Sequence, residues 1–295
     1  MIAILSAVIP VGLIVLVGFV AAKTLHLELS TLSRLSLYVL FPVLVTDSLY
    51  RTTLSAENAL GIFFGFILTY FLLCLAAWLL GQTLGLSAPV QKSLVATTAF
   101  PNNGNLGLPI TLFALGEAGL ERAVVYMIAS SIVILTTAPV FLIGGSFWSA
   151  VRITLKLPLI WAILLGLGLH WFNVQLPFKT DQGLHLLAQA AIPVALLILG
   201  MQIASNHFQF KPYEVAASLM RLVGGALTAY LVGKALGLAG LDLQVLVLQS
   251  SMPTAITAFL LVNEFGGDAA RTARVVVLST LLAFLTLPMV LWAIN

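Results

Sequence analysis

Two short polar segments interrupt otherwise apolar runs of this sequence, and their residue types suit the binding of an anion. The first is Pro101-Asn102-Asn103-Gly104-Asn105, and the second is Gln249-Ser250-Ser251-Met252-Pro253-Thr254. Pro lacks an amide donor, and Gly and Asn favour non-helical torsions, so neither segment continues an ordinary helix. Each interruption predicts a half-helix whose N-terminal amides are unsatisfied and carry partial positive charge. Such an end attracts anions.

The interruptions supply a set of candidate substrate contacts, all of them uncharged. We expect Pro101 and Pro253 to keep the backbone open, and we expect the anion to meet Asn102, Asn103, Gly104, Asn105, Ser251 and Thr254. The carbonyls at the C-terminal ends of the first half-helices would offer ligands to a sodium ion. The alternative is structural, because a Pro kink whose Asn and Ser side chains bond neighbouring helices is common in membrane proteins.

The composition indicates that lipid surrounds the chain. Hydrophobic residues make up 61% of the 295 residues and charged residues only 8%, whereas a soluble domain is about one-quarter charged. Backbone groups in lipid must bond internally, so we expect an all-α membrane protein of about ten transmembrane helices. The connections leave no room for a soluble catalytic or nucleic-acid-binding module. The single cysteine, Cys74, excludes an intrachain disulfide.

The apolar runs give approximate bounds for the ten spans. We expect them at residues 4–22, 32–50, 59–80, 90–115, 123–143, 157–172, 184–203, 213–236, 243–263 and 273–294. The interruptions therefore fall within the fourth and the ninth span.

Matching landmarks recur in the same order in both halves of the chain. The segment 81–86, Gly-Gln-Thr-Leu-Gly-Leu, recurs at 233–238 as Gly-Lys-Ala-Leu-Gly-Leu, and at the same offset Pro101 aligns with Pro253. We infer two five-helix repeats, 1–146 and 147–295, within one integral membrane domain. Because five is odd, the second repeat enters the membrane from the opposite side. Helices broken at matching points of inverted repeats are typical of a transporter's binding site.

The positive residues predict how the chain is oriented. The odd-numbered connections and their flanking residues hold nine Lys and Arg, and the even-numbered ones hold four. Excess positive charge stays cytoplasmic, so we expect both termini on the outer side of a bacterial inner membrane. The basic residues form no patch, which argues against a nucleic-acid partner.

Two segments of the sequence resemble elements of a known family. Residues 100–109, Phe-Pro-Asn-Asn-Gly-Asn-Leu-Gly-Leu-Pro, are similar to the Asn-Gly-x-x-Gly-x-Pro element of the auxin efflux carrier family, which includes bacterial malonate and malate permeases. Residues 38–42 resemble its second-span element. The resemblance implies ten spans in inverted repeats, with broken, crossing fourth and ninth helices. It also implies alternating-access transport of small organic anions, that is, mono- or dicarboxylates. Unlike the plant members, this chain has only a short connection, 144–156, between its halves.

Other polar residues within the spans are candidates for coupling or for the pathway. Asp47 would bind a proton or sodium, but Arg51 follows four residues later, and we favour an interfacial ion pair. Gln202 and Gln249 would either line the pathway or join helices. For Arg221 we favour snorkelling to the headgroups over contact with an anion. We expect no metal site and no bound cofactor, and leave open coupling to H⁺ or Na⁺ and a homodimer.

Two rival functions remain at the level of the sequence. One is a sodium-coupled symporter resembling the bile-acid carriers. The other is a membrane sensor that binds a ligand without moving it. No matched nucleophile and base appear, so we do not expect an enzyme.

Overall fold

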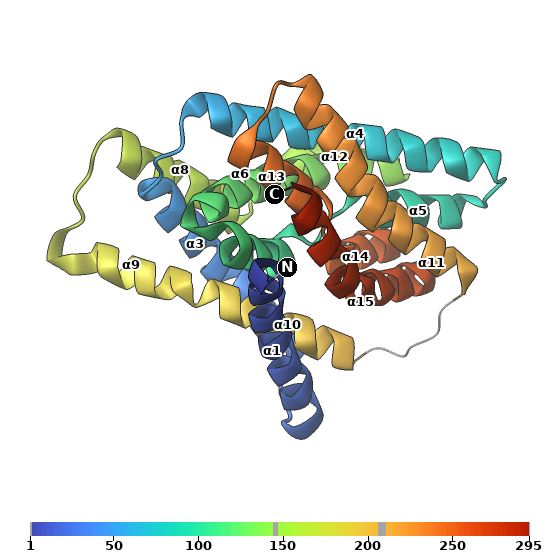
Figure 1. Ribbon diagram of the computed structural model, residues 1–295, viewed down its shortest axis with the longest axis horizontal. Coiled ribbons are helices and arrows are strands. Elements are labelled where there is room, and N and C mark those ends of the chain that lie inside the picture. The colour runs from blue at the N-terminus through green and yellow to red at the C-terminus, as the bar shows by residue number, and fades with distance from the viewer. Residues whose placement is uncertain (1, 144–146, 206–210, 295) are drawn as a thin grey trace.

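The computed structural model describes residues 2–143, 147–205 and 211–294, and helices dominate throughout these ranges (Figure 1). The elements in chain order are α1 (Ile2–Thr24), α2 (Leu29–Leu35), η1 (Ser36–Leu40), α3 (Phe41–Tyr50), α4 (Ala56–Thr83), α5 (Ala88–Ala99), η2 (Asn103–Gly107), α6 (Leu108–Ile143), α7 (Phe147–Thr154), α8 (Pro158–Trp171), η3 (Pro177–Lys179), α9 (Thr180–Gln189), α10 (Ala191–Ala204), α11 (Pro212–Leu219), η4 (Met220–Gly224), α12 (Gly225–Ala235), α13 (Gly240–Ser250), α14 (Ile256–Glu264) and α15 (Ala269–Ile294).

Several helical segments are long and apolar enough to cross a membrane. Among the described residues there are six, namely Leu29–Tyr50, Ala56–Thr83, Asn103–Ala138, Pro177–Ala204, Pro212–Ala235 and Ala269–Ile294. Two further apolar helices, Val8–Thr24 and Pro158–Trp171, are shorter. The chain is therefore a multi-pass, all-helical membrane protein, as the composition predicts. The count of ten spans in inverted repeats stays a prediction.

The turn between the predicted fourth and fifth spans lies at Gly116. Its backbone angles, φ 68° and ψ −169°, are non-helical and divide α6 into two helices joined at this residue. A positive φ is strained for residues with a side chain, so Gly is suited to this position. The predicted connection between the two halves also differs from a plain loop, because it contains the short helix α7.

The helices form two groups that meet along an apolar layer. In the first group, α1 packs on α10, and α3 packs on α8 and α9. In the second group, α4, α5, α6 and α11 to α15 pack against one another (Figure 1). Between the groups, Val11 of α1 and Leu199 of α10 share a buried cluster with Ile110 of α6 and Leu287 of α15. Apolar packing is non-directional, so it does not by itself fix the two groups in one relative position.

Within the first group, α1 and α10 approach each other at glycines. A Cβ added at Gly18 would meet the backbone of Leu197, and one added at Gly200 would meet the backbone of Val15 and Phe19. Small residues let membrane helices pack this closely. By contrast, a Cβ at Gly168 of α8 would meet open space.

We therefore expect Gly200→Ala to destabilise the protein by about 1–3 kcal/mol, because overpacking forces the two backbones apart. Gly168→Ala is the matched control, and it should leave stability unchanged or raise it, since Ala favours helix over Gly by about 1 kcal/mol. Thermal unfolding of the purified protein in detergent measures both. Equal midpoints for the two variants would contradict this account of the α1–α10 contact.

Candidate functional site

The two helix breaks predicted from the sequence are present and pair with each other. Between α5 and η2, and between α13 and α14, the backbone leaves helical geometry and becomes extended. The amide of Asn102 donates to the carbonyl of Pro253 at 2.7 Å, and the amide of Ala255 donates to the carbonyl of Phe100 at 2.9 Å. Pro101 and Thr254 form an isolated antiparallel bridge between these bonds. Each break thus satisfies backbone groups that the other leaves open, as a buried backbone requires.

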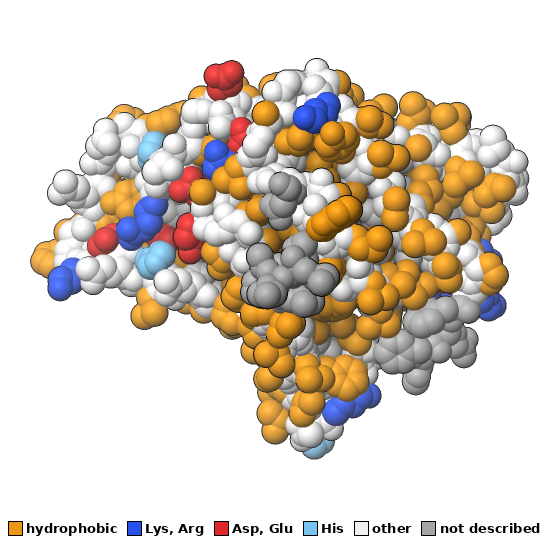
Figure 2. All heavy atoms as spheres, viewed as in Figure 1, with side chains coloured by type: hydrophobic (Ala, Val, Ile, Leu, Met, Phe, Trp, Pro, Cys, Tyr) orange, Lys and Arg blue, Asp and Glu red, His pale blue; other side chains and the backbone are white. Residues whose placement is uncertain are grey.

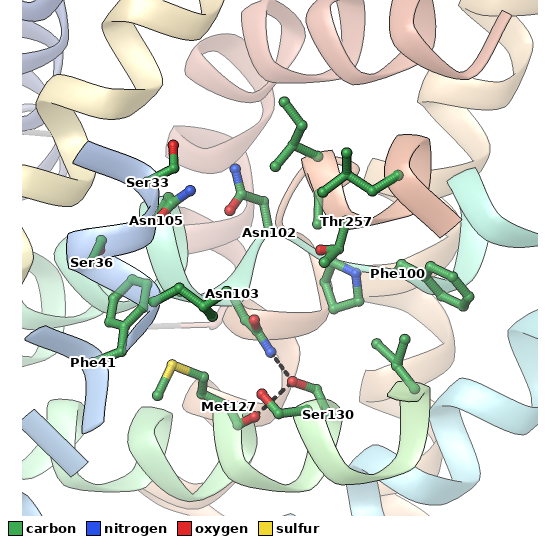
Figure 3. A pocket seen from close by; sticks show the side chains of 18 of the residues that line it. Ser33, Ser36, Phe41, Phe100, Asn102, Asn103, Asn105, Met127, Ser130 and Thr257 are labelled. Carbon is green, nitrogen blue, oxygen red and sulfur yellow. Dashed lines mark hydrogen bonds between the residues drawn. The ribbon is translucent and has the colours of Figure 1, made fainter. Parts of the chain in front are cut away.

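The helical elements that follow the two breaks, η2 and α14, both begin at one cavity of about 260 Å³. The first break contributes Asn102, Asn103, Gly104 and Asn105 to its wall, and α14 contributes Ile256 and Thr257 at its start. The opposite wall comes from the first helix group, through Ser33 of α2, Ser36 of η1 and Phe41 of α3 (Figure 3). Gln202 of α10 also lines the cavity. The cavity therefore lies between the two helix groups.

The side chains of the first break are held to different degrees. The Asn103 side-chain amide donates to the hydroxyl of Ser130 on α6, and Ser130 in turn donates to the carbonyl of Met127 at 2.9 Å (Figure 3). Asn103 is thereby oriented by the protein. The amide groups of Asn102 and Asn105 make no such side-chain bond within the described residues, and the buried hydroxyl of Ser36 likewise has no partner. These groups are available to a ligand.

The cavity has mostly apolar walls with a few polar groups. Among the described residues, those that line it include no Asp, Glu, Lys or Arg. Its polarity comes from amides, hydroxyls and the first turns of η2 and α14, whose N–H groups have no helical partner. A helix N-terminus is equivalent to roughly half a positive charge. Two such ends beside neutral donors have the chemistry that suits a small anion.

A second, charged cavity of about 410 Å³ lies elsewhere between the helix groups. Asp47 of α3 accepts a hydrogen bond from Arg51 at 2.9 Å and pairs with His185 of α9 at 2.7 Å. Glu117 and Glu121 of α6 also line this cavity. The hydrogen bond to Asp47 raises the pKa of Arg51 above its ordinary value. Charged side chains gather at the left of the view in Figure 2. The predicted ion pair between Asp47 and Arg51 is confirmed.

Comparison with known proteins places the chain in a family. A family model described as membrane transport protein matches residues 3–146 and 146–291. The chain belongs to the auxin efflux carrier family of membrane transport proteins. The resemblance drawn from residues 100–109 is therefore confirmed.

Relatives of this family member carry transporter names. An uncharacterized transporter of Methanothermobacter thermautotrophicus is 29% identical over 98% of this chain and 97% of its own length. One of Methanocaldococcus jannaschii is 23% identical over 98% of both chains. A Rhizobium meliloti protein named "Putative malonate transporter" is 26% identical over 67% of this chain and 65% of its own. These names support transport rather than catalysis.

Not all predicted contacts of this family member reach the 260 Å³ cavity. Ser251 and Thr254 are buried and do not line it: the Ser251 hydroxyl donates to the carbonyl of Leu248 at 2.7 Å, and that of Thr254 to the carbonyl of Thr97 at 2.8 Å. Gln249 is also buried, with its amide donating to the Thr111 hydroxyl at 2.9 Å. Thr254 and Gln249 thus bond to other elements, whereas Ser251 bonds to the last turn of its own helix, α13. Gln202, by contrast, lines the cavity.

The expectation for Arg221 is wrong. Its side chain is 1% exposed and does not snorkel to the headgroups. The guanidinium instead donates to the carbonyl of Thr98 in α5 and to the carbonyl of Ser250 in α13. The helix loosens into the π-helical turn η4 at this point, and Gly225 leaves room for the guanidinium beside Ser250. The cation therefore forms hydrogen bonds to backbone carbonyls near two helix ends instead of contacting the membrane surface.

Sequence reasoning missed several residues of the transporter's cavity, namely Ser33, Ser36, Ser130 and Thr257. A signal for two of them was present. Ser33 and Ser36 are three residues apart and therefore share a helix face near the start of the second span. Ser130 has the neighbouring Ser131 within an apolar span. Only the fold brings these positions against the first break.

The two threonines near the second break allow a matched test. We expect Thr254→Val to lower the free energy of unfolding by about 1 kcal/mol, because it removes the bond to Thr97 without changing the side-chain shape. Thr257→Val, at an exposed position on the cavity wall, should leave stability unchanged. Thermal unfolding without ligand measures both. A greater loss for Thr257→Val would contradict the assignment of Thr254 to the pairing of the breaks.

Proposed function

We propose that this protein is a secondary transporter of small organic anions, which binds mono- or dicarboxylates in the 260 Å³ cavity and moves them by alternating access. The observation that carries the proposal is the position of two helix N-termini, those of η2 and α14, at one uncharged cavity that also holds amide and hydroxyl side chains. A carboxylate would meet the first-turn amides and the side chains of Asn102 and Asn105. Asn103, oriented by Ser130, would supply a third contact.

The absence of a charged side chain from the described wall suits transport as well as binding. Dipoles and neutral amides bind an anion less strongly than a bidentate Arg would. A carrier needs this moderate affinity, because it must release its substrate on the far side. The cavity is smaller than the roughly 300–1,000 Å³ of pockets for drug-sized ligands. A small carboxylate suits this volume, and the name of the Rhizobium meliloti relative agrees with that class.

We propose that the two cavities belong to the two sides of the membrane. Ser33, Leu159, Gln202 and Leu260 of the first cavity lie next to odd-numbered connections, which the positive residues assign to the cytoplasm. The charged cavity of Asp47 and His185 would face outward. The apolar cluster that contains Leu44, Leu108 and Ile192 would close the path between them. Rocking of the first helix group against the second would then open the outer side.

The proposal also includes the predicted architecture. Ten spans would form inverted repeats, 1–146 and 147–295, with both termini outside a bacterial inner membrane. The pairing of the fourth-span and ninth-span breaks supports this arrangement, because inverted repeats place their broken helices at a common centre.

The double variant Asn103→Ala with Asn105→Ala tests the site. We expect carboxylate uptake into proteoliposomes to fall at least about tenfold, because hydrogen bonds to a charged group contribute about 1.5–3 kcal/mol each. The expected change is a loss of apparent affinity, measured with radiolabelled malonate at several concentrations. Asn263→Ala is the control, since Asn263 is exposed on α14 and does not line the cavity.

Two results would count against the proposal. Unchanged uptake in the double variant would place the substrate elsewhere. Thermal stabilisation of the wild type by malonate, with no uptake by proteoliposomes under any imposed gradient, would favour a sensor that binds without transport.

A further inference from the structure

Arg221 is a buried cation whose position the anion site does not explain. It does not line either the neutral or the charged cavity, and none of the ion pairs among the described residues includes it. An ionised side chain in a membrane interior is costly without a partner. Its guanidinium donates to the carbonyls of Thr98 and Ser250, which lie in the last turns of α5 and α13, the helices that precede the two breaks.

The partial charges of the two helix ends and the charge of Arg221 sum to about zero. A helix C-terminus carries the equivalent of roughly half a negative charge, so the meeting ends of α5 and α13 carry about one negative charge together. The single positive charge of Arg221 offsets it. The hydrogen bonds are also divided between the two ends, because one guanidinium nitrogen donates to α5 and another donates to α13.

Several further carbonyls at these ends also have protein donors. In α5, the carbonyl of Ala96 accepts from the Phe100 amide at 3.1 Å, and that of Thr97 accepts from the Thr254 hydroxyl at 2.8 Å. In α13, the carbonyl of Leu248 accepts from both the amide and the hydroxyl of Ser251. A metal cation needs several oxygens that it does not share with such donors. Most carbonyls at these ends are therefore already bonded by the chain.

We propose that the Arg221 side chain is the counter-cation of the C-terminal ends of α5 and α13. It occupies the place that a coupling sodium ion would otherwise take. The protein therefore needs no sodium to hold the two broken helices together, and transport by the proposed function is sodium-independent. The proposal excludes the sodium-coupled symporter considered from the sequence. Gly225 leaves the space that this contact needs, because a Cβ there would meet both the Ser250 carbonyl and the Arg221 guanidinium.

Thermal unfolding of the purified protein tests the proposal without any substrate. We expect the wild type to unfold at the same temperature in sodium, potassium and choline chloride. Arg221→Ala should lower the midpoint by about 5–10 °C, because it leaves two buried carbonyls unpaired. Millimolar guanidinium should restore part of that loss, whereas urea at the same concentration should not. Arg34→Ala, at an exposed position, is the control and should neither lose stability nor respond to guanidinium.

A conservative variant keeps the test decisive where Arg221→Ala does not fold. Arg221→Lys retains the charge but lacks the fork that reaches both helix ends, so we expect a smaller loss of stability, again with no response to sodium. A midpoint that rises with sodium in the wild type, or an Arg221→Ala protein as stable as Arg34→Ala, would overturn the proposal. So would a failure of guanidinium to stabilise Arg221→Ala more than urea does.

The transport assay separates this inference from the proposed function. Carboxylate uptake that vanishes when choline replaces sodium would overturn the role of Arg221 and leave anion transport intact. Absence of uptake in either salt, with the guanidinium rescue observed, would overturn the transport proposal and leave the role of Arg221 standing.

Discussion

The constraint on which this structure depends is the need to satisfy backbone groups that two helix breaks expose far from water. An unpaired amide or carbonyl in an apolar environment costs several kcal/mol, and a broken helix exposes such groups at both of its new ends. The protein meets this cost by pairing one break with the other, through the bonds of Asn102 to Pro253 and of Ala255 to Phe100. Pro at the centre of each break helps, because it brings no amide donor that would need a partner.

The two kinds of helix end are treated in opposite ways. At the C-terminal ends of α5 and α13 most carbonyls are bonded by the chain, among them those that accept from Arg221, Thr254 and Ser251. At the N-terminal ends of η2 and α14 the backbone borders a cavity whose polar side chains are partly without partners. The breaks are thus satisfied on one side by the chain itself, and the other side is available to a ligand. This asymmetry supports the proposed preference of the site for negative charge.

The position of the cavity connects this chemistry to motion. Its walls come from both helix groups, and the groups meet through apolar side chains such as Val11 and Ile110. Such an interface resists sliding far less than one joined by buried hydrogen bonds. The close contact of α1 with α10 at Gly18 and Gly200 lies inside the first group and keeps that group together. A substrate held by the second group would therefore be exposed as the first group moves as a unit.

The sequence by itself determined the features that depend on local chemistry. Pro101 and Pro253, with the Asn and Ser around them, cannot continue a helix, so the positions of both breaks followed from residue type. The apolar composition required lipid and helices, and the spacing of Asp47 and Arg51 predicted their ion pair.

Tertiary structure decided which polar groups face the cavity and which face a neighbouring helix. Thr254 and Ser251 have the same chemistry as the serines of the cavity, yet Thr254 bonds to the carbonyl of Thr97 in α5 and Ser251 to that of Leu248 in its own helix. Nothing in their sequence context distinguishes these roles from contact with the cavity. Arg221 turned inward because α5 and α13, which come from distant parts of the chain, end beside it. Side-chain direction in a packed membrane protein depends on what the fold places within reach, and only contacts between distant segments supply that information.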